Sequence, residues 1–165
     1  MLTAHAMPSL VFLILTLPIC LWVSFSDLKF MKIPNKSVIA LTFVFVIFGL
    51  IMMPWKAYGW GLAQLVIVLA LGFVLTIAGA MGAGDAKFGA AMAAFIAPGD
   101  WQVFLAIFSA CLLAGFVLHR IARAIPAIRR ASTDWISWGS KKYPMGLSLA
   151  TSLMAYLAAG VAFGQ

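Results

Sequence analysis

Long apolar runs alternate with short polar stretches along the 165 residues of the chain. A helix needs about 20 residues, within a range of about 17–25, to cross a hydrocarbon core of about 30 Å. Five apolar runs reach that length, and they cover residues 10–26, 37–53, 60–80, 101–119 and 144–163. The pattern predicts an all-α integral membrane protein in which most connections between the helices are short.

A sixth apolar stretch, residues 88–97, is too short to cross a bilayer, since ten helical residues reach only about 15 Å. It either dips into the membrane and returns, or belongs to a helix that begins earlier. A dip would leave the basic segment 120–143 outside, against the positive-inside rule. With six crossings and the N-terminus outside, ten of the eleven basic residues lie inside and only Lys56 lies outside. We therefore predict a sixth crossing helix over 82–98 and one membrane domain over 1–165.

Composition supports a membrane protein and excludes several other classes. The chain is 65% hydrophobic and 9% charged, whereas soluble domains are about 45–50% apolar and about 25% charged. The net charge of +7 is explained by topology, so no nucleic-acid partner is expected. The two cysteines lie in apolar runs without a C-x-x-C pair, and the two histidines are far apart. We therefore expect no disulfide framework, no metal site and no cofactor.

All four acidic residues are aspartates, and two of them have simple structural interpretations. Asp100 follows Pro98-Gly99 and precedes an apolar helix on the outer side, which predicts a helix N-cap. Asp134 follows Ser132-Thr133 in the basic inner segment, which predicts another cap or a solvated charge. Neither residue needs a catalytic role.

The other two aspartates, Asp27 and Asp85, fall together at the inner membrane edge. Asp85 lies in the first turn of the predicted helix 82–98, directly after Gly82-Ala83-Gly84. Two residues without side chains let a second chain approach the acid closely. Alternatively, the positive helix N-terminus and Lys87 simply stabilise an interfacial carboxylate.

Asp27 follows the last apolar residues of the first run, on the same inner side. The simple alternative is an ion pair with Lys29 or Lys32. Two carboxylates that meet in a low-dielectric site cannot both ionise readily, so the pair shares a proton. Aspartic proteases use this arrangement: one carboxylate activates water while the other polarises the scissile amide.

Three motifs, in this order along the chain, resemble those of the type IV prepilin peptidases, a family of bacterial membrane aspartic proteases with a G-x-G-D motif. They are Asp27 followed by Ile33-Pro34-Asn35, then Gly82-Ala83-Gly84-Asp85-Ala86-Lys87, then Tyr143-Pro144-Met145-Gly146. The resemblance implies that Asp27 and Asp85 are the catalytic pair. It also implies that the surrounding motif residues shape the substrate site, namely Gly82, Gly84, Lys87, Ile33, Pro34 and Asn35.

The resemblance further implies a substrate and a location. The substrate would be a prepilin-like protein, whose leader is cleaved after a glycine at the cytoplasmic face of the bacterial inner membrane. Larger members carry paired C-x-x-C motifs in a zinc-binding segment and also methylate the new N-terminus. This chain lacks that segment, so it looks like the short form of tight-adherence pilus systems, without methyltransferase activity. Met145 stands where a P-Y-G or P-F-G pattern is more common.

Two other functions are compatible with membrane aspartates. A transporter or channel would use them to carry protons or cations, although the outer halves of the apolar runs hold almost no polar residues. A scaffold subunit of a pilus or secretion assembly would need the basic segment but not the aspartates. The identity of the prepilin, the oligomeric state and the choice of general base are left open by the sequence.

Overall fold

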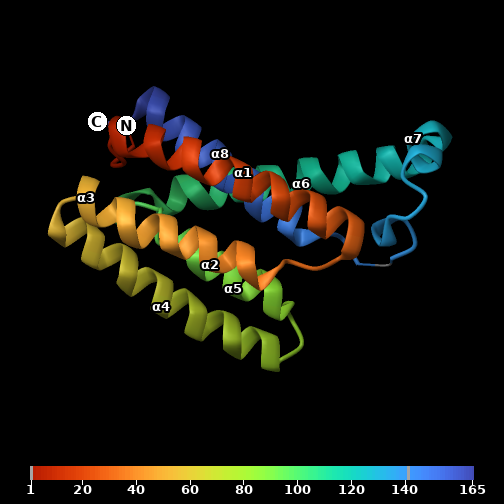
Figure 1. Cartoon of the computed structure of the whole chain (residues 1–165), viewed down its shortest axis with the longest axis horizontal. Coiled ribbons are helices and arrows are strands. Elements are labelled where there is room, and N and C mark those ends of the chain that lie inside the picture. Colours follow the sequence, from red (N-terminus) through yellow and green to blue (C-terminus); the bar gives the residue numbers. More distant parts are fainter. Residues whose placement is uncertain (1, 141) are drawn as a thin grey trace.

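The computed structural model describes residues 2–140 and 142–165, and within these ranges it contains helices and no strands (Figure 1). The long elements form an antiparallel bundle. They are α1 (Ala6–Phe30), α2 (Asn35–Val44), α4 (Trp55–Ile77), α5 (Ala83–Ala93), α6 (Trp101–Ala124) and α8 (Met145–Phe163). The helix α2 continues through a π-helical turn, Phe45–Gly49, into α3 (Leu50–Met52). The all-α prediction is confirmed.

Five of the helices that the structure describes are long and apolar enough to cross a membrane, and they correspond to the five predicted runs. The polar ends of these helices extend past the apolar residues: α1 continues to Phe30, and α6 continues through Arg120 and Arg123 to Ala124. Helical hydrogen bonding does not stop where hydropathy falls, so the sequence pattern underestimates these helices.

The helix α5 is shorter than the predicted 82–98, because it ends at Ala93 after 11 residues, about 16 Å at 1.5 Å per residue. The chain then turns towards Pro98. Gln64 Nε2 donates hydrogen bonds to the carbonyls of Ala93 and Ile96, at 3.1 and 2.8 Å. The Ala97 amide donates to the hydroxyl of Tyr156 at 3.0 Å. These side chains satisfy the backbone at the helix end, which allows an irregular segment to be buried among apolar helices.

The short helix α5 lies at the centre of the bundle. It packs against α4, α2 and α8. The helix α8 in turn packs against α1 and α6. The last residues of α5, from Ala90 to Ala93, and the segment that follows them to Ile96 are all buried. Small side chains in this stretch let the surrounding helices approach closely. The second half of α5 is therefore packed firmly against the neighbouring helices.

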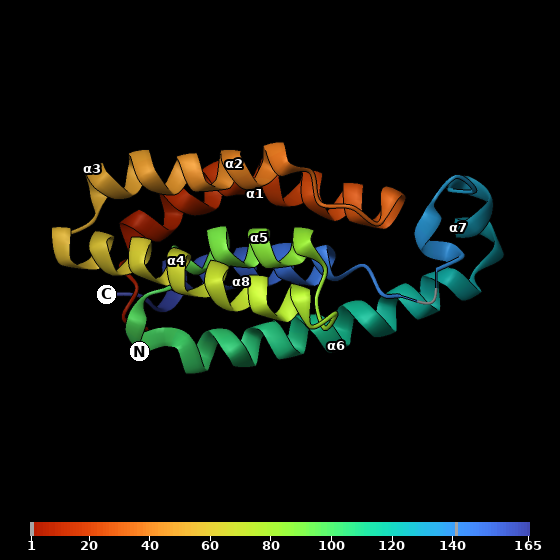
Figure 2. The ribbon, with the colours of Figure 1, turned by 90° about the horizontal axis from the view of Figure 1, so that it is seen from below.

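The antiparallel order brings one set of helix ends together at the end of the bundle that carries α7 (Pro126–Ala131) (Figures 1 and 2). We call this the α7 end: α1, α4 and α6 finish there, and α2, α5 and α8 begin there. The two chain termini meet at the opposite end, where the Ala6 amide donates to the carbonyl of Gln165 at 2.9 Å.

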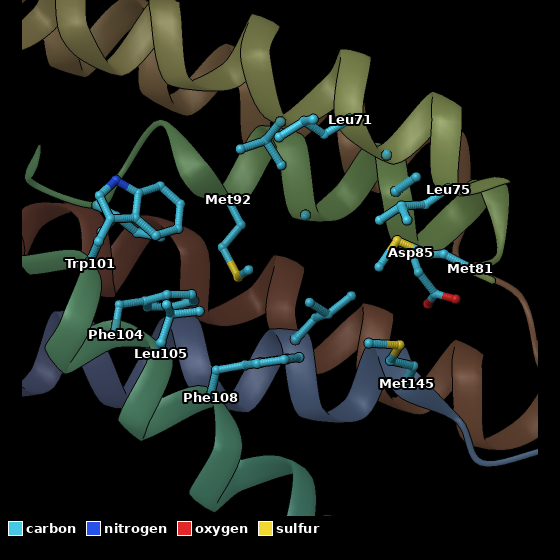
Figure 3. A pocket seen from close by; sticks show the side chains of 16 residues that line it. Leu71, Leu75, Met81, Asp85, Met92, Trp101, Phe104, Leu105, Phe108 and Met145 are labelled. Atoms are coloured by element: carbon cyan, nitrogen blue, oxygen red, sulfur yellow. The ribbon is translucent and has the colours of Figure 1, made fainter. Parts of the chain in front are cut away.

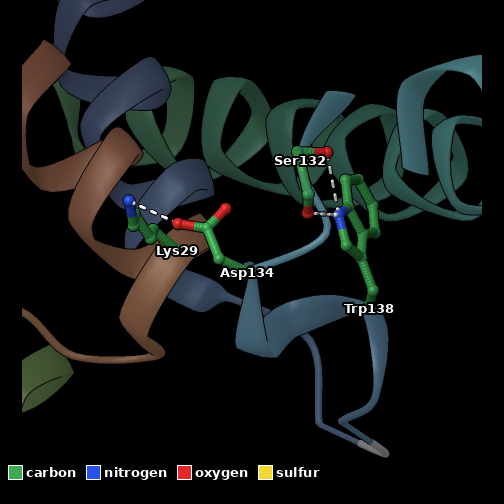
Figure 4. Close-up of polar contacts among 4 residues, drawn as sticks. All are labelled: Lys29, Ser132, Asp134 and Trp138. Atoms are coloured by element: carbon green, nitrogen blue, oxygen red, sulfur yellow. Dashed lines mark hydrogen bonds and ion pairs between the residues drawn. The ribbon is translucent and has the colours of Figure 1, made fainter. Parts of the chain in front are cut away.

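The predicted basic segment 120–143 folds back onto α1 (Figure 4). Lys29 Nζ lies 2.6 Å from Asp134 Oδ2. The rings of Trp135 and Phe25 pack edge to face, with their centroids 6.0 Å apart. The indole of Trp138 donates to the backbone and hydroxyl oxygens of Ser132, each at 3.0 Å. Asp134 is thus a solvated charge, but one that pairs with Lys29.

The predicted cap role of Asp100 is wrong, because its side chain makes no cap hydrogen bond to α6. The carboxylate is buried and accepts four hydrogen bonds instead. Thr3 donates to Oδ1 from its amide and its hydroxyl, both at 2.8 Å. The amide of Ala4 and the hydroxyl of Tyr156 donate to Oδ2, at 3.0 and 2.9 Å. Asp100 therefore joins the segment before α1 to α8.

Candidate active site

Asp27 lies in the last turns of α1, and only 5% of its surface is exposed. The backbone amide of Gly146, at the start of α8, donates a hydrogen bond to Asp27 Oδ2 at 2.7 Å. Lys29, an alternative partner for Asp27, pairs with Asp134 instead. The carboxylate of Asp27 is therefore fixed by a backbone donor on a second helix.

A tight turn after α1 brings the next motif back beneath Asp27. Met31 closes the helix in the left-handed conformation, with φ of 54°, a position that glycine usually occupies. The hydroxyl of Ser26 donates to the carbonyl of Lys32 at 2.9 Å and holds the turn. Ile33 then points into the space between α5 and α8, as its contacts with two glycines show.

Asp85 is the third residue of α5, after the N-cap Gly82. A Cβ atom built on Gly82 would lie 2.7 Å from Asp85 Oδ2, so any larger residue would displace the carboxylate. The first turn of a helix is also its positive end, which favours an acidic side chain there. The glycine of the motif thus leaves the Asp85 carboxylate in the position that it has in this turn.

Both aspartates line one pocket of about 300 Å³ at the α7 end, together with Lys32, Gly82 and Gly84. Ile33 joins the three motifs within this pocket. A Cβ atom on Gly84 would lie 3.3 Å from Ile33 Cβ, and one on Gly146 would lie 2.9 Å from Ile33 Cδ1. The isoleucine therefore packs against one glycine from each of the other two motifs.

The remaining predicted motif residues lie beside the pocket rather than in its lining. Pro34 is the N-cap of α2, and its carbonyl accepts a hydrogen bond from Ser37 Oγ at 2.7 Å. Lys87 Nζ donates to Asn35 Oδ1 at 3.4 Å, which links the second motif to the first across the surface. These residues position the segments that carry Asp27 and Asp85.

Gly146 is the site residue that the sequence analysis did not select. Its signal was present, because it closes the third motif, Tyr143-Pro144-Met145-Gly146. In the same motif the hydroxyls of Tyr143 and Ser148 share a hydrogen bond of 2.7 Å. Burial raises the pKa of Tyr143, so this hydroxyl remains protonated at neutral pH.

The polar pocket suits chemistry performed by carboxylates and water. Two carboxyl groups on separate helices face one small cavity, where one can accept a proton while the other donates one. In the part of the chain that the structure describes, no three His, Cys, Asp or Glu side chains gather as a metal site would require.

Comparison with protein-family models identifies the family, and the matched range contains the first two of the three motifs. No curated protein and no solved structure matches the chain significantly. The model of the type IV leader peptidase family matches residues 14–119, a range that contains Asp27, Asp85 and well over half of the chain. The family resemblance drawn from the three motifs is thereby confirmed, and the chain belongs to the type IV leader peptidase family.

Proposed function

We propose that this protein is a membrane aspartic endopeptidase that removes the leader from prepilin-like proteins. The cut follows a glycine at the cytoplasmic face of the bacterial inner membrane, and Asp27 and Asp85 are the catalytic pair. The observation that carries the proposal is that both carboxyl groups line one pocket, which the glycines of the second motif also line. The family match supports peptidase chemistry.

The two carboxyl groups divide the work of hydrolysis. One is ionised and takes a proton from water while the water oxygen attacks the scissile carbonyl carbon. The other is protonated and hydrogen-bonds the carbonyl oxygen, which stabilises the developing negative charge. When the tetrahedral intermediate collapses, the C–N bond breaks and the leaving amine receives the proton taken from water. Gly82 and Gly84 leave room for an extended peptide beside Asp85.

The distribution of charge supports a cytoplasmic site. Of the ten basic residues that the structure describes, only Lys56 lies away from the α7 end, in the first turn of α4. Positively charged ends of membrane proteins face the cytoplasm. With the α7 end inside, the aspartate pair meets the leader of a substrate whose apolar helix stays in the bilayer.

The test is cleavage of a synthetic prepilin-like substrate by the protein reconstituted in lipid vesicles. Asp27→Asn and Asp85→Asn should each lower the cleavage rate by at least about 10³-fold, the scale of lost acid–base catalysis. Asp134→Asn is the matched control, since it removes an exposed acid at the same end and should leave the rate unchanged.

Two results would contradict the proposal. Cleavage by either Asn variant at the wild-type rate would remove the carboxyl pair from the mechanism. Proton or cation flux through the vesicles that depends on Asp85, without cleavage of any substrate, would favour a transporter.

A further inference from the structure

A second cavity, about 290 Å³ in volume, runs from Asp85 along the side of α5 that lies between α4 and α6 (Figure 3). The carboxylate of Asp85 lies at one end and the indole of Trp101 at the other. Between them the lining is apolar, with Met92 and Phe108 among its side chains. Among the described residues that line it, Asp85 is the only acidic or basic one.

Two helices form the walls of this groove with the same spacing of residues. The helix α4 contributes Leu71, Gly72 and Leu75, and α6 contributes Phe104, Leu105 and Phe108. Residues four apart lie on one face of a helix, so each wall is a single helical face. In this region α4 packs on α5 and α6 packs on α8, which leaves the groove between α4 and α6.

Two small residues of α5, Ala86 and Gly89, form part of the floor of the groove. Ala86 contacts Gly72 so closely that a Cβ atom on that glycine would lie 2.9 Å from the Cβ of Ala86. A Cβ atom on Gly89, in contrast, would meet no other atom within 4 Å. Small residues at a surface within the membrane allow another helix to approach closely.

Asp85 connects this groove with the polar pocket, because it lines both cavities. A peptide bond held at Asp85 would therefore have a polar pocket on one side and an apolar groove on the other. A lipid chain gains nothing from a carboxylate at the end of its groove. A protein substrate whose apolar helix begins near the cleaved bond fits both cavities at once.

We propose that the groove between α4 and α6 docks the apolar membrane helix of the substrate, with the leader directed into the pocket of Asp27. This inference rests on the proposed function and adds the surface that selects the substrate. Docking follows the helix-in-groove mode, in which one face of an apolar helix seats between two walls. From Asp85 to Met92 the floor offers about 10 Å, or two helical turns.

Gly89→Leu tests the proposal, because Gly89 lines the groove and a Cβ atom added there would meet no other atom within 4 Å. Gly59→Leu is the matched control: Gly59 is a glycine of α4, is exposed, and likewise has no atom within 4 Å of an added Cβ. Two synthetic substrates share a leader and a cleavage glycine. One continues as an apolar helix of about 20 residues, and the other ends in a short polar segment.

For the substrate with the helix, Gly89→Leu should lower kcat/KM by about tenfold or more, the scale of an obstructed apolar pocket. Cleavage of the short substrate should stay at the wild-type rate, and Gly59→Leu should cleave both substrates normally. A second measurement does not depend on Gly89. Phe108→Cys, combined with Cys111→Ser and Asp85→Asn, should form a disulfide with a cysteine placed in the substrate helix.

The outcomes separate this inference from the proposed function. If the wild-type protein cleaves both substrates, and Gly89→Leu does so equally well, the groove is not the docking site. The same conclusion follows if Phe108→Cys captures no substrate while the wild-type protein cleaves it. If the wild-type protein cleaves neither substrate, the proposed function fails, and the inference fails with it.

Discussion

The backbone amide of Gly146 donates a hydrogen bond to Asp27 Oδ2 at 2.7 Å, across 119 residues of sequence. The glycine has no room for a side chain, since an added Cβ would lie 2.9 Å from both Asp27 Oδ2 and Ile33 Cδ1. Gly146→Ala would therefore keep the amide donor but push the carboxylate away.

For Gly146→Ala we expect a loss of cleavage rate of about 10- to 100-fold, as a catalytic group misplaced by about 1 Å produces. The measurement is kcat for the synthetic substrate in vesicles, with Gly59→Ala as the control at an open position. An unchanged kcat would show that the Gly146 contact does not position Asp27.

Ile33 packs between Gly84 and Gly146 and holds the segments that carry the two aspartates. Ile33→Ala removes this packing. Because the side chain is only partly buried, the free energy of unfolding should fall by about 1–2 kcal/mol, below the range for a full core position. Ile33→Val should lower the free energy of unfolding by less. The cleavage rate of Ile33→Ala, corrected for the folded fraction, should also drop. An unchanged rate would mean that Ile33 stabilises the fold without positioning the aspartates.

The hydrogen bonds of Asp100 predict that replacing it lowers the stability of the protein but not its cleavage rate. Asp100→Ala leaves donors of Thr3, Ala4 and Tyr156 without their acceptor. Unpaired donors cost about 1–3 kcal/mol each, so thermal unfolding in detergent should begin at a clearly lower temperature. The cleavage rate per folded molecule should remain at the wild-type value, because Asp100 lies at the end opposite the pocket. A lower cleavage rate of fully folded Asp100→Ala would contradict the prediction that Asp100 stabilises the fold without contributing to catalysis.

The Lys29–Asp134 pair predicts a pH dependence of the loop beside α1. The hydrogen bond from Lys29 lowers the pKa of Asp134 in the folded protein. The pair therefore favours the folded loop above the ordinary aspartate pKa of about 3.9. This contribution is lost as pH falls through the lower, folded-state value. The effect is small, because both groups are accessible to solvent.

The ¹⁹F NMR signal of 5-fluorotryptophan at Trp135, which contacts Phe25, should report release of this loop. The signal should shift as pH falls below about 4, and Lys29→Met should show the shifted signal already at neutral pH. A wild-type signal that does not change with pH, or a Lys29→Met signal equal to that of the wild type, would exclude this role for the pair.

The apolar runs predicted the long helices because hydropathy over about 20 residues is a strong, local signal. The end of α5 could not be predicted in the same way. It depends on Gln64 and Tyr156, which are distant in sequence and satisfy the backbone where the helix stops. The role of Asp100 could not be predicted for the same reason, because its hydrogen-bond donors Thr3 and Tyr156 are distant in sequence.

The residues of the candidate site could be selected from the sequence, because its motifs are local and carry unusual residues. The structure places Asp27, Asp85, Gly82, Gly84 and Ile33 around one pocket, and their catalytic and binding roles stay predictions. Gly146 was not predicted as a site residue, because a glycine in a sequence reveals nothing about its backbone amide until the partner of that amide is known. Its position beside Asp27 follows from the packing of α1 along α8.

The most direct test of the central claim is a double-mutant cycle on Asp27 and Asp85, read as the rate of leader cleavage. Groups that act as one unit are not additive, so removing both costs little more than removing one. We predict that Asp27→Asn, Asp85→Asn and the double variant all retain the same small residual rate. Catalysis by Asp27 and Asp85 as a pair is contradicted if the two losses multiply in the double variant, or if either single variant cleaves as fast as the wild type.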